Sequence, residues 1–145
     1  MSTEHKWKVA FANDSSFFSK IRVNILQGLG FEVVMCTNAD EVMQCFGPRT
    51  QEPCRMLVTD AHLAHSEELV SRAETNDCTE TGLVLYKKLR AANRTLPIVL
   101  YVTDRQLFRE AESIHDPYFA VVYDCDEGAT MAIVEIVQKS FARKV

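Results

Sequence analysis

Short apolar runs alternate with amphipathic stretches along the chain. Each run has the length and apolar content of a strand that is buried on both faces. After each run, apolar residues recur at steps of three and four positions, which is typical of an amphipathic helix. The pattern predicts strands at residues 7–12, 31–36, 55–60, 96–102 and 118–123, and helices at 17–29, 39–46, 80–92, 105–114 and 127–142.

Polar and turn-forming residues mark the ends of these elements. Asn38 supplies a side chain that caps the second helix, and Gly47-Pro48 ends that helix. Buried strands separated by helices indicate a parallel sheet with helices on both sides, so we expect one doubly wound α/β domain over residues 1–145. The predicted apolar face of the first helix consists of Phe17, Phe18, Ile21, Ile25, Leu26 and Leu29.

The composition supports a globular domain and excludes several function classes. Lys and Arg number 16 and Asp and Glu 20, so the formal net charge is −4, and the sequence has no basic stripe for nucleic acid. Apolar residues make up 47% of the chain, too many for a disordered protein. The longest apolar runs, about five or six residues, are far shorter than the ~20 of a membrane span, and the polar start lacks the apolar core of a secretion signal. We expect a cytoplasmic protein that binds neither nucleic acid nor a membrane.

The cysteine pattern does not predict a metal site. The sequence contains no CxxC or CxH pair, so zinc is poorly supported, and we expect reduced thiols. Redox activity of Cys36 or Cys125, which end strands, is the alternative, although the sequence places no cation beside either thiol. The five cysteines are Cys36, Cys45, Cys54, Cys78 and Cys125.

Oxygen-bearing side chains follow four of the five predicted strands. In an open parallel sheet, functional groups gather at the edge where the strands end. Carboxylates at close range repel one another unless a cation lies between them, and hard oxygen ligands suit Mg²⁺ or Mn²⁺. The residues at these strand ends are Asn13 and Asp14, Asp60, Thr103 and Asp104, and Tyr123 and Asp124.

These landmarks resemble the receiver domains of two-component response regulators over essentially the whole chain. Asn13-Asp14 stands where the family has its acidic pair, and Asp60 ends the run Leu57-Val58-Thr59-Asp60 as the family's phosphoacceptor does. No single motif is specific, but the landmarks follow the family's order around five βα units. Further matches are Leu29-Gly30-Phe31-Glu32-Val33, Thr81-Gly82-Leu83, Leu89-Arg90, Leu96-Pro97-Ile98-Val99 and Thr103.

The resemblance implies a (βα)5 flavodoxin-like sheet with strand order 2-1-3-4-5 and a defined chemistry. Asp60 would accept a phosphoryl group from a histidine kinase or a phosphotransfer protein. Mg²⁺ would be held by Asp14, Asp60 and the main-chain carbonyl of His62, and Asn13 would reach the ion through water. The Thr103 hydroxyl would bind the phosphoryl group and act as the switch. Such a domain is not an enzyme beyond its own phosphoryl transfer and dephosphorylation.

The resemblance also implies where partners bind. Phosphorylation would change the surface formed by the fourth helix, the fifth strand and the fifth helix. We expect this surface to bind a downstream protein target, or a second copy in a homodimer. Because the chain ends at Val145, just past the fifth helix, we expect a stand-alone receiver in a phosphorelay.

Three features depart from the family pattern. The lysine position at the end of the fifth strand holds Tyr123, which can donate a hydrogen bond but carries no positive charge. Asn13 replaces one carboxylate of the acidic pair, which should weaken Mg²⁺ binding. Residues 61–80 form an insertion between the third strand and the third helix. A short helix over residues 66–73 is predicted there, lying over or beside the site.

Structural roles are the alternatives for the predicted site residues. Asp60 is then a turn aspartate, Asp14 a cap of the first helix and Thr103 a cap of the helix that begins at residue 105. His62 and His65 lie beside Asp60, but without a third ligand we expect loop histidines rather than a transition-metal site.

Three other functions compete with a phosphorylated receiver. The first is a pseudo-receiver, a protein-binding module that works without phosphorylation. The second is a flavodoxin-like cofactor binder, although Asp14 would repel a phosphate in the first loop. The third is a phosphatase with an aspartate nucleophile, which would need an acid where His62 stands.

Overall fold

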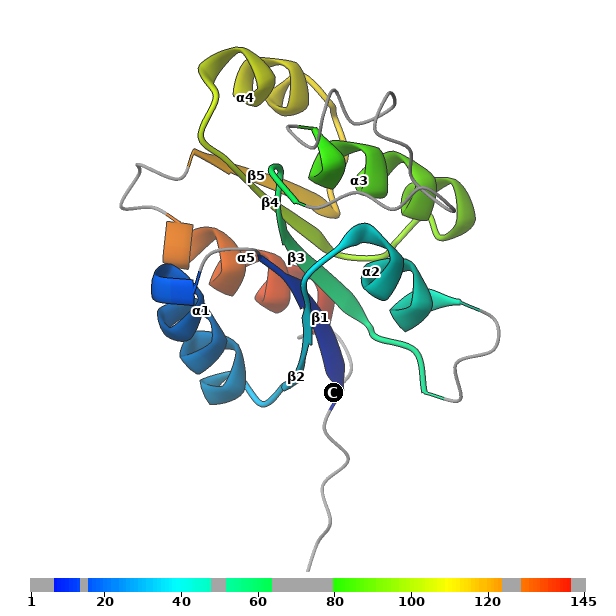
Figure 1. Ribbon diagram of the computed structural model, residues 1–145, viewed down its shortest axis with the longest axis vertical. Coiled ribbons are helices and arrows are strands. Elements are labelled where there is room, and N and C mark those ends of the chain that lie inside the picture. The colour runs from blue at the N-terminus through cyan, green and yellow to red at the C-terminus, as the bar shows by residue number, and fades with distance from the viewer. Residues whose placement is uncertain (1–6, 14–15, 48–51, 64–79, 124–128, 142–145) are drawn as a thin grey trace, which may run out of the picture.

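The computed structural model describes residues 7–13, 16–47, 52–63, 80–123 and 129–141. Within these residues, five strands alternate with five helices in the predicted order, with bounds close to those expected from the sequence (Figure 1). The elements are β1 (Lys8–Ala12), α1 (Ser16–Gly28), β2 (Glu32–Cys36), α2 (Ala39–Phe46), β3 (Met56–Asp60), α3 (Thr81–Ala92), β4 (Ile98–Val102), α4 (Arg105–Glu112), β5 (Phe119–Tyr123) and α5 (Ala129–Phe141).

The strands form one parallel sheet in the order β2-β1-β3-β4-β5, which confirms the predicted topology. The order reverses at β1, since the chain first builds outward to β2 and then crosses back to β3 on the other side of β1. In sheets of this kind the crevice at the carboxyl ends of the strands beside the reversal is the usual binding place. The topology therefore directs attention to the ends of β1 and β3.

Helices cover both faces of the sheet, as the apolar strands require (Figure 1). Helices α2, α3 and α4 pack on one face, and α1 and α5 pack on the other. Successive strand residues point to opposite faces, so in β3 Leu57 joins the α2–α4 side while Met56 and Val58 join the α1–α5 side. All five residues of β4 are buried. No helix within the described residues is long and apolar enough to span a membrane.

Two helix starts are fixed by side-chain caps. The Asn38 side chain accepts a hydrogen bond from the Glu41 N–H of α2 at 2.9 Å, as predicted. The Thr37 hydroxyl and N–H donate back to the Glu41 carboxylate at 2.6 and 2.7 Å, and these bonds lower the pKa of Glu41. At α4 the cap is Asp104, which accepts from the N–H groups of Gln106 and Leu107. The alternative that Thr103 caps this helix is therefore wrong.

A partly buried arginine, Arg90, joins α3 to the amino edge of the sheet, opposite the predicted site. The Arg90 Nε donates to the Asp116 carboxylate at 2.7 Å, and the guanidinium also donates to the main-chain carbonyls of Leu96 and Tyr118. The Tyr86 hydroxyl donates to the same carboxylate oxygen at 2.6 Å. Burial alone would raise the pKa of Asp116, but these hydrogen bonds and the one from the Tyr118 N–H outweigh it and lower the pKa.

Candidate functional site

The strand register brings three of the predicted site residues to one edge of the sheet. In the β1–β3 pair, Ala12 lies opposite Thr59, so Asn13 and Asp60 follow on neighbouring strands. In the β3–β4 pair, Asp60 lies opposite Tyr101, two residues before Thr103. Asp14 lies outside the described residues, so its place as a metal ligand or as a helix cap stays a prediction.

Asp60 is the last residue of β3 and is only partly open to solvent. Its side chain is 17% exposed, and its Oδ1 lies 3.4 Å from the Nη1 of Arg22 on α1. The side chain of Arg22 is 10% exposed, and its guanidinium carbon lies 3.7 Å from the centre of the Tyr101 ring. Because Asp60 and Tyr101 are register partners on adjacent strands, a single arginine contacts both. Asp60 thus lies beside a buried positive charge that the sequence analysis did not identify.

The prediction for α1 was wrong at the position that matters most for this contact. Ile21, which was assigned to the apolar face, is 55% exposed, whereas Arg22 is 8% exposed. Arg22 precedes the fully buried Leu26 by four positions, and this helical spacing places both residues on the inward face. Ile21 has the same i, i+4 relation to Ile25, so helical spacing alone does not choose between Ile21 and Arg22.

Asn13 is a buried polar residue at the end of β1. It is 7% exposed, and its N–H donates to the main-chain carbonyl of Cys36 at 3.2 Å, which extends the contact between β1 and β2 by one residue. The backbone of Asn13 is therefore tied to β2 at the edge where β3 presents Asp60. An amide oxygen at the end of β1 can accept a hydrogen bond from a water ligand of Mg²⁺, which is the role that the resemblance implies for Asn13.

Tyr123, at the position of the family's lysine, packs against α4. Its ring meets the ring of Phe108 edge-on, with centroids 5.6 Å apart. Tyr123 is half-buried and pairs with Val102 in the sheet register. The phenol is therefore held by an apolar contact with α4, while the cation that contacts Asp60 comes from α1.

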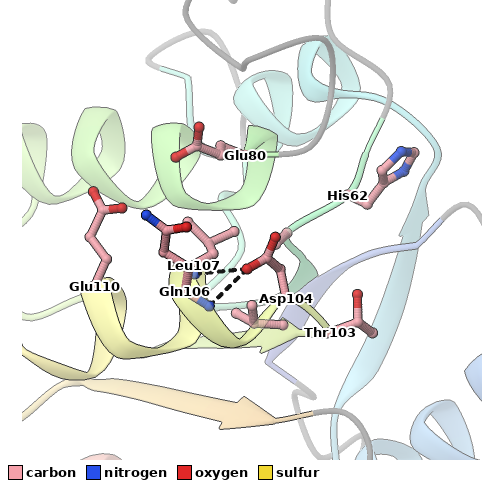
Figure 2. Close-up of a pocket in the computed structure, with 9 residues that line it drawn as sticks. His62, Glu80, Thr103, Asp104, Gln106, Leu107 and Glu110 are labelled. Atoms are coloured by element: carbon pink, nitrogen blue, oxygen red, sulfur yellow. Dashed lines mark hydrogen bonds between the residues drawn. The ribbon is translucent and has the colours of Figure 1, made fainter.

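A pocket of about 350 Å³ opens between the segments that follow β3 and β4. Figure 2 shows His62 and Thr103 on one side of this pocket and the carboxylates of Glu80 and Glu110 on the other. His62 and Thr103 are exposed, so both reach solvent at the rim of the predicted site. The lining is Ala61, His62, Glu80, Val102, Thr103, Asp104, Gln106, Leu107 and Glu110.

The start of α3 lies directly on the backbone that follows Asp60. The Gly82 N–H donates to the Ala61 carbonyl at 2.9 Å, and the Thr81 hydroxyl donates to the Leu63 carbonyl at 2.5 Å. A Cβ at Gly82 would meet the Asp60 carbonyl oxygen at 2.4 Å, so only glycine fits without a backbone shift. The Thr81-Gly82-Leu83 motif is thereby explained by packing. Residues 64–79 of the insertion, with the helix predicted at 66–73 and His65, lie outside the described residues.

Comparisons with known proteins show the fold. No family model matches the chain, and no curated protein matches it. A response-regulator receiver protein from Sinorhizobium medicae superposes with a TM-score of 0.69 at 13% identity, covering 99% of this chain and 100% of that one. This chain has the fold of response-regulator receiver domains.

Two further solved structures share the receiver fold. The receiver domain of a sensor histidine kinase from Pseudomonas aeruginosa, with a magnesium ion coordinated in its active-site cleft, has a TM-score of 0.63 at 14% identity, covering 95% of this chain and 99% of that one. A chemotaxis response regulator of Vibrio cholerae has a TM-score of 0.59 at 14% identity, covering 94% of this chain and 100% of that one. The predicted (βα)5 architecture is thus confirmed by topology and by comparison.

Some of the oxygen atoms at the candidate site suit a hard cation. Asp60 and Asn13 present carboxylate and amide oxygens at adjacent strand ends, which are donors that Mg²⁺ accepts. Among the residues that the structure describes, no group of three or more His, Cys, Asp or Glu side chains forms a metal site. The guanidinium of Arg22 meanwhile places positive charge 3.4 Å from an Asp60 oxygen. A cation at Asp60 therefore has to share the carboxylate with Arg22.

Proposed function

We propose that this protein is a response-regulator receiver that accepts a phosphoryl group on Asp60 and switches a protein-binding surface. The observation that carries the proposal is the placement of Asp60, a partly buried carboxylate at the end of β3, beside the point where the strand order reverses in a receiver fold. Asn13 and Thr103 end the two strands that flank β3. The upstream partner is a histidine kinase or a phosphotransfer protein.

The reaction is a transfer between two nucleophiles. A carboxylate oxygen of Asp60 attacks the phosphorus of a phosphohistidine, the P–O bond forms as the P–N bond breaks, and the product is a mixed anhydride. Mg²⁺ supplies positive charge for the oxygens of the phosphoryl group in transfer. Asp14, Asp60 and the main-chain carbonyl of His62 would hold the ion, and Asn13 would reach it through water. The magnesium-bound Pseudomonas receiver domain supports this choice of ion.

Arg22 supplies the positive charge that Tyr123, at the position of the family's lysine, cannot supply. Its guanidinium already lies 3.4 Å from Asp60, and the Tyr101 ring supports it from one side. A guanidinium is a planar donor that matches phosphoryl oxygens, so Arg22 is placed to donate to a phosphoryl group on Asp60. Positive charge thus reaches the site from α1 instead of β5.

The output surface consists of α4, β5 and α5. Thr103 lies on the segment that joins β4 to α4, so a hydrogen bond from its hydroxyl to the phosphoryl group would draw this segment inward. Tyr123 packs on Phe108 of α4, which couples β5 to the same movement. Met131 of α5 is 57% exposed and offers an apolar contact for a protein target or a second copy.

Phosphorylation by a small acyl phosphate in the presence of Mg²⁺ tests the proposal. The intact mass of the wild-type protein should increase by one phosphoryl group, and Asp60→Asn should abolish the gain. Asp104→Asn is the matched control, because asparagine also caps a helix and this carboxylate stands at the same edge of the sheet. No phosphoryl gain in the folded wild type, or a gain that persists in Asp60→Asn, contradicts the proposal.

The pseudo-receiver is the second candidate, and the Arg22–Asp60 contact is the observation that favours it. A buried guanidinium beside the acceptor neutralises the carboxylate without a metal. A protein of this kind binds its partner through the same fold and stays unmodified. Absence of phosphoryl gain together with an unchanged melting temperature in Mg²⁺ would favour this candidate over the first.

A further inference from the structure

Three cysteines that are spread along the sequence meet beside β1. Cys36 ends β2, Cys45 lies on α2, and Cys54 precedes β3; all three are reduced. The sulfur atoms of Cys36 and Cys45 are 3.7 Å apart. The N–H of Cys54 donates to the carbonyl of Cys45 at 3.0 Å, which holds the third cysteine against α2. The crossover from β2 through α2 to β3 brings these residues together, so spacing along the sequence did not reveal the cluster.

The cluster has one accessible thiol in front of two buried ones. Cys36 is 1% exposed and Cys54 is 5% exposed, whereas Cys45 is half-buried. A surface pocket of about 290 Å³ is lined by all three cysteines and by Lys8, Glu41 and Glu52. A small polar oxidant can therefore reach the cluster from solvent through this pocket.

Hydrogen bonding within the cluster shifts the pKa values of its thiols in opposite directions. Hydrogen bonding with Cys36 and Cys54 lowers the pKa of Cys45, and the charge of Lys8 adds to this effect against burial and the Glu41 carboxylate. The same hydrogen bonds, together with burial, raise the pKa of Cys36 and of Cys54. Since the thiolate is the nucleophilic form of cysteine, the lowered pKa favours Cys45, the accessible member of the cluster, as the nucleophile. Lys8 is the neighbouring cation that the sequence analysis did not find.

We propose that Cys45 and Cys36 form a peroxide-sensitive thiol pair, in which Cys45 is oxidised first and Cys36 closes a reversible disulfide. The observations that carry the proposal are the 3.7 Å separation of the two sulfurs and the pocket that opens on them. The proposal does not depend on phosphorylation of Asp60. It takes up the alternative that Cys36 is redox-active, and it adds Cys45 as the partner thiol.

The chemistry balances with a hydroperoxide as the oxidant. The Cys45 thiolate attacks one peroxide oxygen, the S–O bond forms, the O–O bond breaks, and the departing hydroxide takes up a proton to leave as water. The Cys36 sulfur then attacks the sulfur of the Cys45 sulfenic acid. The S–S bond forms, the S–O bond breaks, and the released hydroxide takes the Cys36 thiol proton to form a second water. Two electrons pass from the two sulfurs to the peroxide.

The geometry requires only a local adjustment. The sulfurs must close from 3.7 Å to the roughly 2.05 Å of a disulfide bond. The proposal requires a movement of the Cys45 side chain, which is partly open to the pocket, toward Cys36 at the end of β2. Cys54 is the competing partner for Cys45, and identification of the linked peptides decides between the two.

The test treats the reduced full chain with one equivalent of hydrogen peroxide under native conditions. Remaining thiols are then alkylated, and the linked peptides are identified by mass spectrometry. We expect two fewer alkylated thiols, one Cys36–Cys45 linkage, and recovery of both thiols after reduction. Absence of this linkage from folded wild type, or its replacement by a Cys45–Cys54 linkage, overturns the proposal.

Serine variants assign the two roles. Cys45→Ser should lose the fast reaction with peroxide, whereas Cys36→Ser should retain it and accumulate a sulfenic acid on Cys45 that dimedone traps. Cys78→Ser is the matched control and should form the same Cys36–Cys45 disulfide as the wild type. If Cys45→Ser consumes peroxide as fast as the control does, Cys45 is not the residue oxidised first. Should either variant fail to fold, the linkage found in the wild type still decides.

Discussion

Two largely buried arginine–aspartate pairs lie at opposite edges of the sheet and differ in the surroundings of the guanidinium. Arg90 and Asp116, at the amino edge, are 2.7 Å apart, and the side chains are 15% and 12% exposed. Arg22 and Asp60, at the carboxyl edge, are 3.4 Å apart, and the side chains are 10% and 17% exposed. Burial is thus similar in the two pairs, and the difference lies in the length of the contact and in the surroundings.

The surroundings indicate different roles. The Arg90 guanidinium also donates to the carbonyls of Leu96 and Tyr118, so its position is set by the backbone. The Arg22 guanidinium lies on the face of the Tyr101 ring, and its contact with Asp60 is longer than the contact of Arg90 with Asp116. We infer that the first pair is part of the framework, whereas the second, at the candidate site, responds to a change in the charge of Asp60.

Removal of each arginine should separate these roles most clearly. Arg90→Met removes the charged donor of the Asp116 carboxylate and a hydrogen bond to each of three main-chain carbonyls, so we expect a loss of about 3–5 kcal/mol in the free energy of unfolding. Arg22→Met should lose less, about 1–2 kcal/mol, because Asp60 lies at an edge that water can reach. Urea denaturation of both variants measures the difference. An equal or larger loss for Arg22→Met would show that the carboxyl-edge pair is also part of the framework.

Acid should weaken the amino-edge pair over a defined pH range. The pKa of Asp116 is lower in the folded protein than its usual value of 3.8, so the unfolded chain binds more protons in acid. The stabilisation is complete above about pH 5 and is lost as the pH falls through the folded pKa. Urea midpoints between about pH 3 and pH 7 should decline less steeply for Asp116→Asn than for the wild type. Parallel curves for the two proteins would contradict the role given to Asp116.

The fold could be predicted from the sequence because its strands and helices are set by local patterns. The run that forms β4 is apolar throughout, and Asn38 caps α2 as its position predicts. Site residues that follow strands, such as Asp60 and Thr103, could be placed at one edge because a parallel sheet aligns the ends of its strands.

The contacts that give the site its character could not be predicted in the same way. In α1, Ile21 and Arg22 are adjacent, and a helical period fitted to the apolar residues favours Ile21, whereas the structure turns Arg22 inward. The arginine is tolerated there because Tyr101 and Asp60 offer it a ring and a charge, and both belong to strands far along the chain. Cys36 and Cys45 likewise meet only through tertiary packing. Long-range pairs of this kind have no local signature in a single sequence.

Magnesium binding should respond to Arg22 if Asp60 is a ligand. Because the guanidinium repels a second cation at the same carboxylate, Arg22→Met should bind Mg²⁺ about tenfold more tightly, which corresponds to about 1.4 kcal/mol. The same variant should accumulate less phosphoryl group, since the charge that holds it is lost. Calorimetric titration with Mg²⁺ measures the first effect, and Arg94→Met, an exposed arginine at the amino edge, is the control. Unchanged affinity in Arg22→Met would show that the ion does not approach Asp60.

Loss of the contact between Arg22 and Tyr101 should have the smallest effect on the free energy of unfolding. Two substitutions of Tyr101 test this contact directly. Tyr101→Phe keeps the ring beneath the guanidinium, whereas Tyr101→Leu removes it. A double-mutant cycle of Tyr101→Leu with Arg22→Met should give a coupling of about 1 kcal/mol, and the cycle with Tyr101→Phe a coupling close to zero. Chemical denaturation of the four proteins in each cycle measures these values. A negligible coupling with Tyr101→Leu would mean that the ring does not position Arg22 beside Asp60.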